Sequence, residues 1–159
     1  MDTRLRPKVC PERGKEAMRT AINEYYSPEE SIRLLLSHKA IIEDGEIMPY
    51  LAYAMQFIPK LAVDWLVSHC LFGRMALQRL GQPDALGICE AIEPNEHYWI
   101  TLDNSLLARS LLTIVETIMH ECAHAVLRHN EEGKEHCDNE AENLVKRWIN
   151  EWEYRKQSR

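Results

Sequence analysis

The chain has 159 residues, of which 45% are hydrophobic and 28% are charged, and its formal net charge at pH 7 is −6. This length and hydrophobic content predict one domain over residues 1–159, with a core large enough that stability does not depend wholly on a metal. The negative net charge argues against a surface built for non-specific DNA binding, although basic residues crowd both ends of the chain.

The first half of the chain is predicted to be helical. Residues 12–25 carry apolar side chains at helical spacing and are expected to form the first helix. A second helix should begin after Ser27, because Pro28 suits the first helical position and Glu30 completes a capping box, and it should run to about Glu43. Further apolar helices are expected over residues 50–58 and 61–80.

The pattern changes after Pro83. Residues 86–92 and 97–102 suggest two short strands, and the turn residues between them predict a β-hairpin. Two helices should follow, one over 107–127 after a cap at Asp103, Asn104 or Ser105, and one from about Glu135 to Glu153. The expected fold class is therefore α+β, a mostly helical single domain with a small β-hairpin or sheet beside the 107–127 helix.

The 107–127 helix contains the motif HExxH at residues 120–124. His120 and His124 lie about 40° apart around a helix axis, so both imidazoles can reach one ion, and zinc is the expected metal. Glu121 is the expected general base, which takes a proton from water and passes it to the leaving amine. A chance match on an amphipathic helix is the plainer alternative. A structural zinc would require a closed set of four ligands and would leave Glu121 without a role.

A catalytic zinc usually has three protein ligands, so one more has to be found. Glu140 is the expected third ligand, because an antiparallel return of the chain would bring its carboxylate beside the two histidines. The alternatives on the same segment are His136, Cys137 and Asp138. His129 fits less well, because the metzincin pattern requires glycine where this chain has Leu127. The hairpin offers an edge to which an extended peptide substrate can add.

HExxH followed by Glu140-Ala141 on a helix resembles the ImmA/IrrE family of zinc metallopeptidases. The helical motif around Glu140-Ala141 usually has Asn or Asp in the family where this chain has Glu142. This departure puts in doubt whether neighbouring residues hold the metal ligands in place as they do in the family. The resemblance covers roughly residues 120–145. The short single-domain build is most similar to the CapP proteases associated with CBASS antiphage operons, which pair with a CapH repressor.

This resemblance implies a gluzincin-like minimal metallopeptidase. Its expected substrate is a helix-turn-helix transcriptional repressor, whose cleavage releases genes after DNA damage or derepresses a stress or antiphage operon.

Cys10, in the sequence Lys8-Val9-Cys10-Pro11-Glu12, resembles the cysteine switch of matrix metalloprotease propeptides. Its thiolate could occupy the fourth position of zinc and displace the catalytic water, which would make residues 1–15 an autoinhibitory segment. A free surface cysteine is the alternative. The basic ends of the chain permit activation by single-stranded DNA, with the polyanion drawing this segment away from zinc; such activation should weaken steeply with salt.

Two other functions stay open from the sequence. A SprT-like protease acting on DNA-linked proteins would favour a histidine such as His136 as the third ligand. A non-catalytic module could instead bind DNA or the repressor without cutting it.

The start of the chain lacks an apolar core followed by small residues, so it does not resemble a secretory signal. No apolar stretch is long enough to span a bilayer, and five cysteines without regular spacing are typical of reduced thiols. We therefore expect a cytoplasmic protein that does not contact a membrane.

Overall fold

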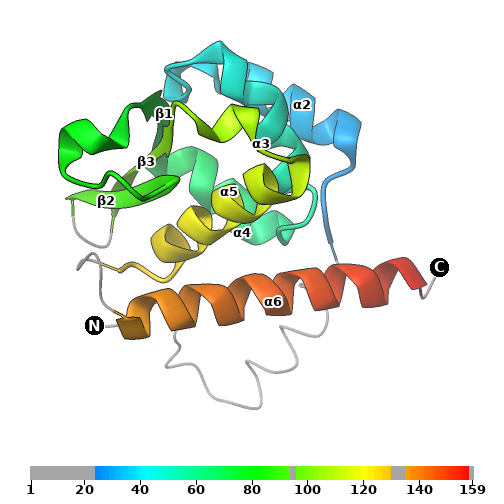
Figure 1. Cartoon of the computed structure of the whole chain (residues 1–159). Coiled ribbons are helices and arrows are strands. Elements are labelled where there is room, and N and C mark those ends of the chain that lie inside the picture. Colours follow the sequence, from blue (N-terminus) through cyan, green and yellow to red (C-terminus); the bar gives the residue numbers. More distant parts are fainter. Residues whose placement is uncertain (1–23, 94–95, 130–134, 158–159) are drawn as a thin grey trace.

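Helix α5, Leu111–Val126, is the central element of the fold, and the sheet and the other long helices pack around it (Figure 1). The computed structural model describes residues 24–93, 96–129 and 135–157. Helix α5 contacts the sheet and three helices: α3 (Met48–Met55), α4 (Lys60–His69) and α6 (Glu135–Gln157). Helix α6 runs along one side of the molecule for its whole length, as Figure 1 shows. The HExxH motif thus lies on the helix with the most tertiary support.

Helix α2, Pro28–Ser37, begins as the sequence predicts. The hydroxyl of Ser27 accepts a hydrogen bond from the backbone N–H of Glu30, and the carboxylate of Glu30 accepts one from the backbone N–H of Ser27. The predicted end near Glu43 is wrong. The Ser37 hydroxyl donates to the carbonyl oxygen of Leu34, and a short 3-10 helix, η1, follows over Lys39–Ile41. The helix expected over 12–25 lies almost entirely outside the described residues.

The helix expected over residues 61–80 is wrong in its second half. Helix α4 ends at His69, strand β1 follows over Cys70–Met75, and the 3-10 helix η3 occupies Leu77–Leu80. A short apolar run such as Cys70–Met75 suits a buried strand as well as a helix, and sequence periodicity alone does not separate the two. Parallel pairing with β3 (His97–Asp103) decides in favour of the strand.

The predicted hairpin is confirmed. Strand β2, Gly87–Glu93, pairs with β3 in antiparallel fashion, and the strand order is β1-β3-β2. On the far side of β1, Ile42 forms an isolated parallel bridge with Phe72. The expected α+β class is therefore confirmed, with a mixed sheet of three strands in the described chain where two were expected.

Helix α5 begins later than predicted. Its N-cap is Ser110, whose hydroxyl oxygen accepts from the backbone N–H of Thr113 at 3.2 Å. Asp103 instead accepts hydrogen bonds from the backbone N–H groups of Leu77 and Ser105, at 2.8 and 2.9 Å. The 3-10 helix η4, Leu106–Ala108, lies between. Asp103 thereby joins the end of β3 to η3.

None of the helices in the described part of the chain combines the length and apolar character that a membrane crossing requires.

Candidate metal centre

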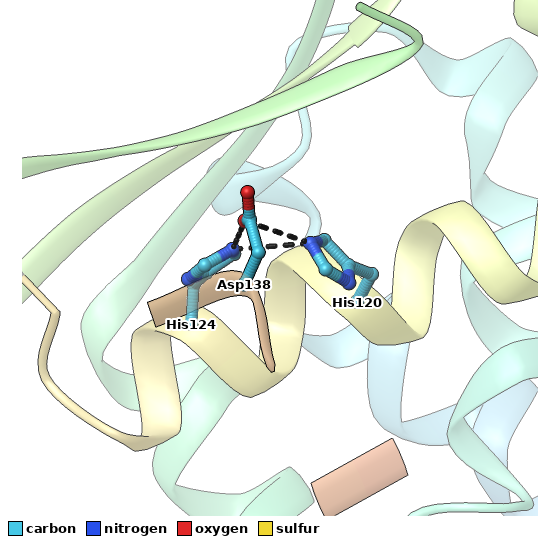
Figure 2. Close-up of side chains that lie close together, drawn as sticks. All are labelled: His120, His124 and Asp138. Atoms are coloured by element: carbon cyan, nitrogen blue, oxygen red, sulfur yellow. Dashed lines mark hydrogen bonds and ion pairs between the residues drawn. The ribbon is translucent and has the colours of Figure 1, made fainter. Parts of the chain in front are cut away.

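Three side chains from two helices converge on one point (Figure 2). His120 and His124 come from the last turns of α5, and their Nε2 atoms are 3.1 Å apart. Asp138 comes from the first turn of α6, and its Oδ1 lies 3.0 Å from Nε2 of His124 and 3.4 Å from Nε2 of His120. The geometry brings together two imidazoles and one carboxylate, a donor set that suits zinc.

The hydrogen-bonding capacity of these side chains and their neighbours fits a cation at this point. His124 contacts Asp138 through Nε2 and His129 through Nδ1, the latter at 2.8 Å, and His129 contacts Glu140 through Nε2 at 2.8 Å. These three contacts need three hydrogens, whereas two neutral imidazole rings carry two. A cation among Asp138, His120 and His124 removes the shortage, because each of them then offers it a lone pair. The residues present therefore fit a divalent metal ion.

The protonation state of His124 also suits metal binding. Burial of the ring, followed by the charges of His120 and His129, lowers the pKa of His124 to about 4, against the opposing influence of Asp138. The ring is therefore neutral at pH 7, and neutral imidazole is the form that coordinates metals.

The converging side chains open onto a cavity of about 260 Å³ between β2 and the two helices. Glu121 lines this cavity and is only 6% exposed. A Cβ atom on Gly87 of β2 would lie 3.1 Å from Cγ of Glu121 and 3.0 Å from Cγ2 of Thr117, so glycine permits a close approach of the strand to α5. The remaining lining residues are Gln82, Ala85, Ile88, Cys89, His120, His124, His129 and Asp138.

The structure brings together three of the residues predicted from the sequence and separates a fourth. His120, His124 and Glu121 all line the cavity, but the carboxylate of Glu140 lies against His129. Asp138, one of the alternatives for the third ligand, is the carboxylate beside the histidine pair. Because residues two positions apart on a helix are separated by about 200° around its axis, Asp138 and Glu140 point in different directions. Direct coordination by Glu140 stays a prediction.

The other candidates lie away from this point. Cys137 is buried and its Sγ lies 3.9 Å from Nε2 of His136. Of the three residues that the sequence offers as donors to a tetrahedral oxyanion, His97 pairs with Glu93 on the exposed end of the hairpin, Tyr98 is fully buried in the core, and His129 lines the cavity. The sequence did not predict the contacts of His129 with His124 and Glu140, because these depend on how the chain turns after α5.

Cys10 falls outside the described residues, so the cysteine switch stays a prediction, as does the basic cluster near the start of the chain. At the other end, two of the basic residues stack on aromatic rings. Arg155 lies over Tyr25, at 5.6 Å from the ring centroid, and Lys156 lies over Trp152 at 4.9 Å.

Comparison with known proteins gives no matching family model, no matching curated protein and no matching solved structure. The resemblance to ImmA/IrrE metallopeptidases thus rests on the motif residues alone.

Proposed function

We propose that the protein is a zinc-dependent endopeptidase whose metal is held by His120, His124 and Asp138. One observation carries the proposal: three ligand atoms within 3.4 Å of one another border a cavity that also contains the buried carboxylate of Glu121. Three protein ligands beside an open cavity are typical of catalytic zinc, whereas structural zinc is usually enclosed by four ligands.

Glu121 is the proposed general base. Bound zinc would acidify a water molecule and polarise the scissile carbonyl. The carboxylate of Glu121 takes a proton from water and delivers it to the departing amine, so no protein nucleophile is required. The close approach of Gly87 to the Glu121 side chain restricts the position of that side chain, which limits the reorganisation that proton transfer needs.

Strand β2 is the proposed docking edge for the substrate. It is at the end of the strand order, it pairs with β3 alone among the described strands, and its residues Gly87, Ile88 and Cys89 line the cavity. An extended peptide can add to such an edge through backbone hydrogen bonds, which places a peptide bond beside the metal. The resemblance to the ImmA/IrrE family and its CapP-like members supports a helix-turn-helix repressor as the substrate, cleaved to derepress a stress or antiphage operon.

Glu121→Gln is the variant that tests this function. It should retain zinc, because Glu121 is not a proposed ligand, and should lose cleavage of a co-expressed repressor, because an amide cannot accept the proton. Glu116→Gln, an exposed position on the same helix, is the matched control and should cleave normally. Cleavage and zinc content are measured together on purified protein. Full cleavage by Glu121→Gln would remove Glu121 from the mechanism, and equal repressor release without cleavage would support a binding module.

The position of Asp138 also weighs against a SprT-like protease. That alternative favours a histidine such as His136 as the third ligand, but the Nε2 of His136 lies near the sulfur of Cys137. The carboxylate of Asp138 lies beside the histidine pair instead.

A further inference from the structure

The proposed function assigns no role to His129 and Glu140, yet these two residues form a continuous series of contacts that leads to His124. His129 Nδ1 lies 2.8 Å from His124 Nδ1, and His129 Nε2 lies 2.8 Å from Glu140 Oε1. The side chain of Glu140 is 56% exposed and that of His129 is 11% exposed, so this series of contacts leads from the surface inward.

We infer that Glu140 and His129 form an orienting relay, which holds the ring of His124 in the tautomer that binds metal. The inference rests on the proposed zinc site and makes His129 and Glu140 positioning residues.

The direction of every hydrogen bond in the relay follows from Glu140. An ionised carboxylate only accepts, so Nε2–H of His129 must donate to it. In a neutral ring this leaves a lone pair on Nδ1 of His129, which accepts from Nδ1–H of His124. His124 then has its lone pair on Nε2, the atom 3.0 Å from Asp138 and 3.1 Å from Nε2 of His120. The free nitrogen of a metal-binding histidine commonly donates to a carboxylate in this way, and here His129 is interposed.

The backbone after α5 is shaped to bring His129 to this position. Arg128 has φ of 60°, the only positive φ outside glycine in the described ranges. Two hydrogen bonds close the turn, from the N–H of Arg128 to the carbonyl of Ala125 at 3.0 Å and from the N–H of His129 to the carbonyl of His124 at 3.1 Å. This is the Schellman motif, in which glycine is the usual left-handed residue.

Arg128 adopts the left-handed conformation with support from its side chain. Its guanidinium lies over the ring of Trp65, at 4.1 Å from the centroid, and its Nη1 donates to the carbonyl of Val126 at 2.8 Å. These contacts offset the steric cost of the left-handed conformation. They hold the chain in a turn that returns His129 to the side of His124.

Zinc affinity tests the relay without reference to peptidase activity. Competition with a chelator is measured for the wild type and for variants of both relay residues. His129→Leu should bind zinc about 10–100-fold more weakly, because His124 loses its acceptor. His129→Asn should recover much of this affinity, because its amide oxygen can accept from His124. Glu140→Gln keeps an acceptor for His129 and should lose less affinity than Glu140→Leu.

Two controls accompany these variants. His38→Leu removes a histidine that contacts the carbonyl of Leu34 at the end of α2, away from the cavity, and should bind zinc normally. Asp138→Asn removes a proposed ligand and gives the scale for direct coordination. Thermal unfolding of each metal-free variant checks that the relay changes affinity rather than folding.

The outcomes separate the relay from the proposed function. Wild-type affinity in His129→Leu would overturn the relay and leave the zinc site intact. A loss in Glu140→Gln as large as in Asp138→Asn would make Glu140 a ligand and would also overturn the relay. A wild type that binds no zinc would overturn both. A protein that shows the relay effect on affinity but cleaves no peptide contradicts the proposed function alone.

Discussion

Gly87 of the sheet lies close to Glu121, the proposed general base. A Cβ atom at this position would lie 3.0–3.4 Å from Thr117 and Glu121, closer than side chains normally pack, so one of the neighbours must shift by a few tenths of an ångström. Glycine is used in strands where another chain element approaches closely. The strand therefore helps to set the position of Glu121 relative to the proposed metal ligands.

Gly87→Ala should therefore lower peptidase activity while zinc binding is retained. A displacement of a few tenths of an ångström at the carboxylate of Glu121, the proposed general base, is expected to reduce kcat about tenfold, because proton transfer depends on position. The control is Gly45→Ala, since a Cβ there meets no described atom within 4 Å. Steady-state kinetics on both variants, with zinc content measured in parallel, checks this. Unchanged kcat in Gly87→Ala would show that Glu121 tolerates the shift.

Cys70 and Cys122 are buried in the hydrophobic core, and their thiols should be inert in the folded protein. Burial raises the pKa of Cys70 to about 12 and is the main cause that raises the pKa of Cys122 well above its usual 9.0. The thiolate is the reactive form, so neither residue should be alkylated by iodoacetamide at pH 8. Peptide mass spectrometry before and after denaturation measures this. Rapid native modification of either cysteine would mean that the core around it opens.

The sequence could predict those parts of the site that depend on spacing within one helix. His120 and His124 share a face because they are four residues apart, and Glu121 follows from the motif. The choice between Asp138 and Glu140 depends on how α6 is rotated against α5, which no spacing within the chain determines. His129 was missed because its position depends on the left-handed conformation of Arg128, where a glycine would have signalled the turn.

At the scale of the secondary-structure elements, the carboxylate of Asp103 fixes the end of β3 to the segments beside it. Asp103 accepts from the backbone N–H of Leu77 and from both the backbone N–H and the hydroxyl of Ser105. The Ser105 hydroxyl and then the Leu77 N–H hold the pKa of Asp103 below its ordinary 3.8. This carboxylate therefore connects β3, η3 and the turn before η4.

Asp103→Ala should reduce the free energy of unfolding by about 1 kcal/mol at pH 7. This value is low for hydrogen bonds to a charged acceptor, because the carboxylate is partly exposed to solvent. The folded pKa is depressed, so this contribution is present above pH 3.8 and is lost as pH falls through the lower folded value. Urea unfolding at pH 7 and at pH 3 measures both quantities. A difference that grows on acidification would contradict the assignment.

Local signals predicted the elements whose ends are marked by side chains. The capping box at Ser27 and Glu30 gave the start of α2, and the turn residues after residue 92 gave the hairpin. Strand β1 had no such marker, because no proline separates it from α4 and the apolar residues resume at Cys70, directly after Ser68 and His69. Its conformation comes from pairing with β3, far along the chain, and short apolar runs are where periodicity is least informative.

Over the whole molecule, the hydrophobic core extends well beyond the metal site. It includes fully buried Leu35 of α2, Phe72 of β1, Tyr98 of β3 and Ile118 of α5. Such a core does not need an ion to fold, in contrast to small zinc domains that unfold without metal.

Removal of zinc with a chelator should therefore leave the far-UV circular dichroism spectrum nearly unchanged. The free energy of unfolding should fall by the amount that zinc binding supplies, about 4 kcal/mol at a free zinc concentration a thousand times Kd, and the melting temperature should fall with it. Calorimetry over a series of zinc concentrations tests the relation. A chelated protein with a random-coil spectrum would place the metal among the determinants of folding.

The proposed ligands and the relay all lie between residues 120 and 140, whereas Gly87, which positions Glu121, belongs to the sheet. Closing a loop of some twenty residues costs little entropy, so the proposed ligands can be brought together within one contiguous stretch of the chain. Strand β2 precedes both helices in the sequence, so during biosynthesis the strand that packs against Glu121 leaves the ribosome first, and the proposed ligand set is completed only when Asp138 of α6 follows.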